Sequence, residues 1–162
     1  GPGVGAFAAC MKGLQTVDGA AIIRERIANE RPVLGICIGM QILFQEGSEH
    51  GENGNHAGVG IWEGEVSRLE APILPHMGWN EIEDYENQML FKDIDKEDPT
   101  FYFVHSYHLY TDDPSIKCTY TNYGYNFISA VEKENIFGVQ FHPEKSQFNG
   151  LTVLKNFIEI NA

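Results

Sequence analysis

The chain has 162 residues, which fits one domain (1–162) with a buried core, and its 43% hydrophobic and 21% charged residues are typical of a soluble globule. Its formal net charge of −12 at pH 7 argues against a nucleic-acid partner, because the phosphate backbone repels an acidic surface. No apolar run reaches the roughly 18 residues of a membrane span, and the first residues lack the basic and apolar regions of a signal peptide. We therefore expect a cytoplasmic protein without a membrane segment.

The first half of the chain predicts a helix, a buried strand and a second helix in close succession. Apolar residues recur three and four apart in the helix over 19–29, and Pro32 ends it. The short apolar run 33–36 is typical of a buried strand, and the pattern over 38–45 is again helical. This order of elements is that of a parallel α/β sheet.

The second half is richer in strands, with a candidate hairpin turn at 133–135 and a closing helix over 150–160. We predict strands over 60–69, 79–83, 101–110, 117–123, 127–132 and 136–141. The expected fold class is α/β, with a mostly parallel central sheet flanked by helices and an antiparallel, strand-rich second half.

Cys37 stands in the run 35–39 (GICIG), between a predicted strand and a predicted helix. A sharp strand-to-helix turn strains its central residue and crowds its neighbours, which favours glycine on either side. A thiol there lies at a helix N-terminus, where backbone N–H groups stabilise the thiolate and the Ile38 N–H can face a developing oxyanion. The pattern predicts a nucleophile elbow; the alternative is a buried structural cysteine. Cys10 and Cys118 lack this context and are interpreted as small hydrophobes.

His142 and Glu144 flank a proline at the end of a predicted strand, where active sites of α/β proteins gather. A thiol nucleophile needs a base, and the base needs a third group that fixes its tautomer. Pro143 holds His142 extended, and residues two apart in an extended segment project to the same side, so Glu144 can orient the imidazole. The alternative is a surface loop with a solvated glutamate.

The other histidines offer rival bases but no metal-ligand spacing. His105 and His108 lie in the predicted strand over 101–110 without a carboxylate nearby in sequence, which favours packing or substrate contact. His50 and His56 lie in a polar, Gly-rich loop and are expected to be solvated. Because neither the histidines nor the cysteines have the spacing of metal ligands, we expect no metal and no cofactor.

The two catalytic segments carry a resemblance to a known family. The run 35–41 (GICIGMQ) with 140–144 (QFHPE) resembles the signature pair of class I (triad) glutamine amidotransferases. Four further runs resemble the glutaminase subunit of imidazole glycerol phosphate synthase: 2–7 (PGVGAF), 75–80 (PHMGWN), 103–107 (FVHSY) and 144–147 (EKSQ). The resemblance covers essentially the whole chain and implies the flavodoxin-like fold of class I glutamine amidotransferases.

This resemblance implies hydrolysis of L-glutamine to L-glutamate and ammonia through a thioester. Cys37 would attack the amide carbon, His142 would act as general base and then acid, and Glu144 would orient His142. The Ile38 N–H and an amide from Val4-Gly5 would form the oxyanion hole.

The resemblance also implies a glutamine pocket formed by Gln41, Glu49, Ser106 and Tyr107. Each of these residues has a plain alternative. Gln41 could be an exposed residue in the first turn of a helix, Glu49 a solvated loop charge, and Ser106 and Tyr107 simple strand residues.

The implied partner is a cyclase subunit, joined in a heterodimer, which uses the ammonia to make imidazole glycerol phosphate and aminoimidazole carboxamide ribotide in histidine biosynthesis. The face towards this partner would include His76, Met77, Trp79 and Lys145. For Trp79 the alternative is packing in the core.

Members of the family begin with a strand and a helix before the run that here occupies 2–7, so we expect an N-terminally truncated chain. Three other functions stay open at this point. They are an amidotransferase of another pathway, a catalytically silent scaffold that only binds a synthase, and a cysteine peptidase.

Overall fold

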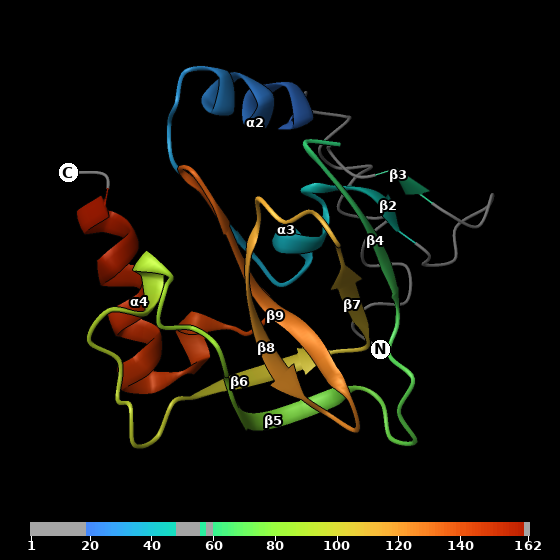
Figure 1. Cartoon of the computed structure of the whole chain (residues 1–162), viewed down its shortest axis with the longest axis vertical. Helices are drawn as coiled ribbons and strands as arrows, with labels where there is room; N and C mark the ends of the chain where they lie inside the picture. The colour runs from blue at the N-terminus through green and yellow to red at the C-terminus, as the bar shows by residue number, and fades with distance from the viewer. Residues whose placement is uncertain (1–18, 48–55, 58–59, 161–162) are drawn as a thin grey trace.

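The computed structural model describes residues 19–47, 56–57 and 60–160. In chain order its elements are α2 (Gly19–Ala28), β1 (Val33–Ile36), α3 (Ile38–Gln41), β2 (Phe44–Gly47), β3 (His56–Ala57), β4 (Trp62–Arg68), β5 (His76–Glu81), β6 (Thr100–His105), β7 (Tyr107–Tyr110), β8 (Lys117–Asn122), β9 (Asn126–Lys133), β10 (Ile136–Val139) and α4 (Gln147–Ile160), with short 3₁₀ turns at Met89–Phe91 and Pro143–Lys145 (Figure 1). No helix within these ranges is long and apolar enough to cross a membrane.

The strands form one large sheet and one small one. The large sheet has the order β1-β10-β9-β7-β4-β2-β3, with β8 also paired to β9, and the small sheet joins β5 to β6. The expected antiparallel second half is confirmed. Parallel pairing is limited, among the described strands, to β1 with β10 and β2 with β4, rather than extending through most of the sheet.

A strand, β2, occupies Phe44–Gly47, where the sequence predicted the end of a helix over 38–45. The helix stops after one turn, at Gln41. Phe44 is fully buried, pairs in register with Trp62 of β4 and contacts its ring edge-on at a centroid distance of 5.5 Å. An apolar run as short as this one fits a buried strand as well as a helix, so its pattern could not decide between them.

Ser106 divides the single strand predicted over 101–110 into β6 and β7. The strand β6 pairs with β5 in the small sheet, whereas β7 lies between β4 and β9 in the large one. The chain therefore changes sheets at Ser106, and the residues on either side of it lie where the two sheets meet.

The remaining elements agree with the sequence apart from their ends. The strand β1 has the predicted bounds, and a turn with a positive φ at Glu134 joins β9 to β10 as predicted. The helix α4 begins at Gln147 rather than 150, and β5 begins at His76 rather than 79. The two-residue strand β3 was not predicted.

The large sheet separates two apolar clusters. One contains Phe101, Phe103 and Phe141 together with Val153, a residue of the long helix α4 that is labelled in Figure 1. The other contains Met40, Phe44, Trp62, Leu109 and Val131. Neighbouring residues of β9 belong to different clusters, as expected when successive side chains of a strand point to opposite faces.

The parallel pairing of β1 with β10 positions the candidate site. Ile36 is opposite Val139, so both strands end at the same edge of the sheet. The residues that follow them in the chain, Cys37 and the segment 140–142, are therefore neighbours.

Candidate active site

Cys37 occupies the sharp turn that the sequence predicted. Its backbone has φ 54° and ψ −110°, a strained conformation for a residue with a side chain. Its N–H donates to the carbonyl of Val139 at 2.7 Å, which ties the turn to the end of β10. A Cβ on Gly35 would lie 2.4 Å from the carbonyl oxygen of Gly39, so only glycine fits at 35.

The Cys37 thiol is 9% exposed and lies among polar groups. The Gln140 side-chain amide donates to Sγ at 3.5 Å, and Sγ lies 3.9 Å from the Val104 carbonyl oxygen. Burial raises the pKa of the thiol to about 11, outweighing the opposite effects of the Ile38 N–H and of Gln140. The sequence predicted that the N–H groups of the following helix stabilise the thiolate. In this state burial has the larger effect, because α3 has a single turn and the sulfur is largely shielded from water.

His142 and Glu144 form the pair that the sequence predicted. His142 Nδ1 lies 3.0 Å from Glu144 Oε2, with His142 in an extended conformation before Pro143. The His142 N–H donates to Tyr102 O at 2.9 Å, and Ser146 Oγ donates to His142 O at 2.6 Å. The backbone of the histidine is thus fixed from two sides.

The strand β6 links the cysteine to the histidine. Its Tyr102 carbonyl binds the His142 backbone, and its Val104 carbonyl faces the Cys37 thiol two residues further along. Glu144 also acts electrostatically on the thiol. No hydrogen bond of the described residues joins Sγ to the His142 ring, a separation common for catalytic pairs in the absence of substrate.

Gln41, Ser106 and Tyr107 are buried rather than on an open surface. Gln41 is 1% exposed, so its alternative interpretation as an exposed helix residue is wrong. Its amide nitrogen donates to Tyr107 O at 3.2 Å and to Gln140 Oε1 at 2.9 Å. Ser106 and Tyr107 are also buried. Val4, Gly5 and Glu49 lie outside the described residues.

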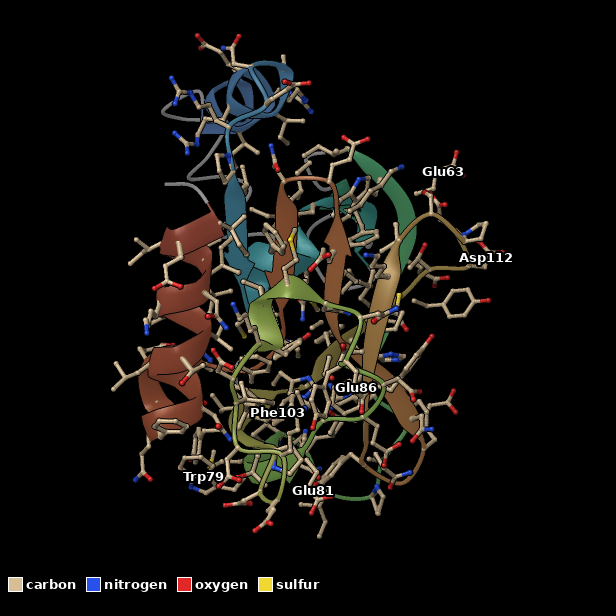
Figure 2. All side chains as sticks on the ribbon, turned by 60° about the vertical axis from the view of Figure 1, so that its left-hand side comes forward. Glu63, Trp79, Glu81, Glu86, Phe103 and Asp112 are labelled. Atoms are coloured by element: carbon tan, nitrogen blue, oxygen red, sulfur yellow. The ribbon has the colours of Figure 1, made fainter. Side chains whose placement is uncertain are left out.

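Of the four residues expected to face a partner, three are exposed. Met77 is 61% and Trp79 48% exposed, and Lys145 is exposed as well. Figure 2 shows Trp79 at the end of the molecule formed by β5, so it is not a core residue. The expectation for His76 is wrong, because its side chain is 3% exposed and stacks on Tyr123.

His105 is buried and His108 is half-buried, and neither has a hydrogen-bonded carboxylate such as the one that His142 has. Burial lowers the pKa of His105 to about 3, and its Nδ1 lies 2.8 Å from Tyr107 O. Burial also lowers the pKa of His108, which contacts Ser67 and Tyr125. Within the described ranges no group of three His, Cys, Asp or Glu side chains could hold a metal ion.

Two residues of the site had no role assigned from the sequence. Gln140 contacts the thiol, and Ser146 braces the histidine by donating to His142 O and accepting from the Tyr102 N–H. Both stand inside the runs that carry the family resemblance. Their contacts depend on tertiary structure, which the sequence pattern alone does not reveal.

The family described as "Glutamine amidotransferase class-I" matches residues 1–160, and the chain belongs to this family. The relatives that it matches include the imidazole glycerol phosphate synthase subunit HisH of Corynebacterium glutamicum, 51% identical over 165 residues, and that of Mycobacterium bovis, 49% identical over 160 residues. These alignments cover 97% and 98% of this chain and 77% and 76% of the relatives.

Two solved structures of glutamine amidotransferases have the same fold. One, from Thermotoga maritima, has a TM-score of 0.58 and 18% identity, with 90% of this chain and 53% of the other covered. The other has a TM-score of 0.65 and 16% identity, with 93% of this chain and 71% of that chain covered. The shared fold is thus that of class I glutamine amidotransferases, as the sequence predicted.

Proposed function

We propose that this chain is the glutaminase subunit of an imidazole glycerol phosphate synthase, which hydrolyses L-glutamine and passes the ammonia to a cyclase subunit. The observation that carries the proposal is the elbow cysteine, Cys37, at the same sheet edge as the His142–Glu144 pair. The identities of 49% and 51% to subunits of that synthase support the choice of pathway.

The carboxylate of Glu144 determines which nitrogen of His142 acts as the base. Because Glu144 Oε2 can only accept, His142 Nδ1 carries the proton of this hydrogen bond and Nε2 keeps its lone pair. With a thiol pKa of about 11, the thiolate is a small fraction of Cys37 at neutral pH in this state. Deprotonation by His142 Nε2 must therefore accompany the attack.

In the first half-reaction Cys37 Sγ bonds to the amide carbon of glutamine as its proton passes to His142. The tetrahedral oxyanion collapses, the C–N bond breaks, and the imidazolium gives its proton to the leaving nitrogen, which departs as ammonia. In the second half, water gives a proton to His142 and attacks the thioester. The tetrahedral oxyanion collapses, the C–S bond breaks to release glutamate, and the imidazolium returns its proton to Cys37 Sγ. The Ile38 N–H, which already acts on the sulfur in this state, is the donor that we assign to the oxyanion, with Val4-Gly5 supplying the other.

We assign glutamine binding to Gln41, Glu49, Ser106 and Tyr107. Gln41, Ser106 and Tyr107 are buried, and Gln41 donates to Gln140, whose amide contacts the Cys37 thiol, which supports a role in binding beside the nucleophile. Glu49 supplies the negative charge that the α-amino group of glutamine needs.

The partner surface that we propose lies on the outer face of β5. Met77 and Trp79 expose large apolar side chains there. We add Lys145, which is also exposed and follows Glu144 in the chain. An exposed tryptophan beside a methionine is typical of the centre of a protein interface. We place the heterodimer in the cytoplasm, where its small-molecule substrates are made.

Ammonia release from L-glutamine, measured with and without a cyclase subunit, tests this function. We expect release that increases with the partner and disappears in Cys37→Ala, while synthesis from added ammonium salts by the Cys37→Ala complex continues. Equal loss of both activities in Cys37→Ala would contradict a role confined to glutamine hydrolysis. Binding of the cyclase without any glutamine hydrolysis would favour the silent scaffold.

A further inference from the structure

Two buried histidines connect the strand β5 with the chain segment at the junction of the sheets. His76 and His105 are opposite each other in the β5–β6 pair and are 3% and 2% exposed. Asn80 Nδ2 lies 3.1 Å from His76 Nε2, His76 Nδ1 lies 2.9 Å from His105 Nε2, and His105 Nδ1 lies 2.8 Å from Tyr107 O. These three contacts form a continuous line from β5 to a backbone carbonyl.

A second set of hydrogen bonds also begins at the Tyr107 carbonyl, and it ends at the Cys37 thiol. Tyr107 O accepts from Gln41 Nε2 at 3.2 Å, and Gln41 Nε2 also donates to Gln140 Oε1 at 2.9 Å. Gln140 Nε2 then donates to Cys37 Sγ at 3.5 Å. Asn80 and the thiol are therefore the ends of one series of hydrogen bonds, most of it buried.

The carbonyl at the centre determines the direction of every hydrogen bond in the histidine half. Because Tyr107 O can only accept, His105 carries its hydrogen on Nδ1 and accepts on Nε2. His76 must then donate from Nδ1 and accept on Nε2, where the amide group of Asn80 donates. Burial lowers the pKa of His76 to about 4 and that of His105 to about 3, so both rings are neutral at pH 7 and keep these tautomers.

Packing alone does not explain this arrangement. His76 stacks between Tyr123 and Phe103, with centroid distances of 4.1 and 4.9 Å, a place that a phenylalanine would fill equally well. Buried polar atoms cost free energy unless they are satisfied, and a hydrogen-bonded series of them favours one geometry. Among the side-chain atoms of this series, Gln41 Oε1 is buried without a partner in the described part of the chain. The geometry favoured here is that of the groups around Cys37.

We propose that Asn80, His76 and His105 are positioning residues for the nucleophile. They hold the Tyr107 carbonyl in place and, through it, Gln41 and then Gln140, whose amide donates to the Cys37 thiol. The inference rests on the proposed function in that Cys37 is taken as the nucleophile. The series begins on the strand that exposes Met77 and Trp79, and so the proposed partner surface and the thiol share one hydrogen-bonded framework.

The sharpest test is Asn80→Asp, which keeps the shape of the side chain and replaces by an acceptor the amide nitrogen that contacts His76 Nε2 and donates to Asn122 O. An aspartate at 80 favours a hydrogen on His76 Nε2, which reverses both imidazoles and turns the lone pair of His105 Nδ1 towards Tyr107 O. The matched control is Asn126→Asp at the exposed start of β9, because Asn126 already accepts through Oδ1 from Asn122 and an aspartate keeps that bond. A second variant, His76→Phe, interrupts the series and keeps the stacking.

Three measurements on the complex with the cyclase subunit decide the matter. Imidazole ¹⁵N chemical shifts report the His105 tautomer, iodoacetamide alkylation reports the Cys37 thiol, and glutamine kinetics give kcat and KM separately. We expect the Nδ1–H tautomer in the parent protein and in Asn126→Asp, and its loss in Asn80→Asp. Asn80→Asp and His76→Phe should change the alkylation rate of Cys37 by about threefold or more and lower kcat by about tenfold with little change in KM.

An unchanged His105 tautomer in folded Asn80→Asp would overturn the proposal, as would a changed tautomer with an unchanged alkylation rate of Cys37. An alkylation rate of Cys37 that stays the same in folded His76→Phe would overturn it as well. These outcomes do not depend on the proposed function. If glutamine is not hydrolysed by the parent protein but the alkylation of Cys37 follows the His105 tautomer, the positioning role stands and the glutaminase assignment fails.

Discussion

His142 Nδ1 and Glu144 Oε2 lie 3.0 Å apart, with Pro143 between them in the chain. The carboxylate is half-exposed and the imidazole is 20% exposed, so the pair is open to solvent whereas the Cys37 thiol is buried. Because the hydrogen bond uses Nδ1, the free Nε2 is the nitrogen available to accept a proton from Cys37.

Glu144→Gln should lower kcat for glutamine hydrolysis by at least about tenfold with little change in KM, because the amide can present its N–H to Nδ1 and stabilise the wrong tautomer. Steady-state kinetics of the complex would show this. Glu159→Gln is the matched control, since Glu159 lies in an exposed pair with Lys155 on α4. Equal effects of the two substitutions would mean that Glu144 does not orient the base.

Gly35→Ala should destabilise the elbow, and Gly39→Ala should not. A Cβ at 35 would lie 2.4 Å from Gly39 O and 2.8 Å from Met40 N, whereas no described atom lies within 4 Å of a Cβ at 39. We expect a loss of about 1–3 kcal/mol in the free energy of unfolding for Gly35→Ala, and a change below about 1 kcal/mol for Gly39→Ala, where alanine favours the helix. Urea unfolding curves measure both, and similar midpoints for the two variants would contradict the crowded geometry of this turn.

The pH dependence of alkylation should reveal the buried state of the thiol. Burial raises the pKa of Cys37 from 9.0 to about 11, so the alkylation rate of the isolated chain should rise about tenfold per pH unit up to about pH 10 without a plateau. The folded state holds this proton more tightly than the unfolded chain does. Its contribution to stability is therefore complete below about pH 9 and is lost as the pH rises through about 11.

Cys118 is the internal control for that experiment, because burial also raises the pKa of its thiol to about 11. Peptide-resolved mass spectrometry would follow the two cysteines in the same sample. A plateau for Cys37 near neutral pH, with Cys118 still rising, would show that the nucleophile is already activated in the isolated chain.

Trp79→Ala should weaken binding of the cyclase subunit by about 2 kcal/mol, or roughly 30-fold in Kd, if Trp79 is a central contact of that interface. Its half-exposed ring contacts only Tyr102 edge-on among the described rings, so the free subunit should keep its stability. Ile158→Ala is the control, because Ile158 is 69% exposed near the end of α4. Isothermal titration would compare the two, and equal affinities would remove Trp79 from the interface.

Local patterns predicted the parts of the fold that depend on local sequence. The strand β1, the elbow at Cys37 and the His142–Glu144 pair all combine a short-range pattern with residues of restricted backbone, and all three appear as expected. The strand β2 was not predicted. Phe44 lies in a strand because it packs on Trp62, which belongs to a later strand, β4.

The rest of the site depends on pairing between strands that are distant in the sequence, and local patterns do not reveal such pairing. The contact of His76 with His105 exists because β5 and β6 pair in one register, and a shift of that register by one residue would separate the rings. The expectation that His76 faces a partner followed from the family resemblance of the run 75–80. It failed because this pairing buries the His76 ring against His105. Gln41 was open to interpretation as a surface residue because its burial depends on contacts with Tyr107 and Gln140, which are distant in the sequence.

Labelling with an electrophilic analogue of glutamine, such as a diazoketone, tests the central claim most directly. If Cys37 is the nucleophile of a glutaminase, one equivalent of label should appear on Cys37, and excess L-glutamine should prevent it. The label should also be lost in His142→Ala while Cys37 is still present. Label distributed over Cys10 and Cys118, or label on Cys37 that glutamine does not prevent, would contradict the account.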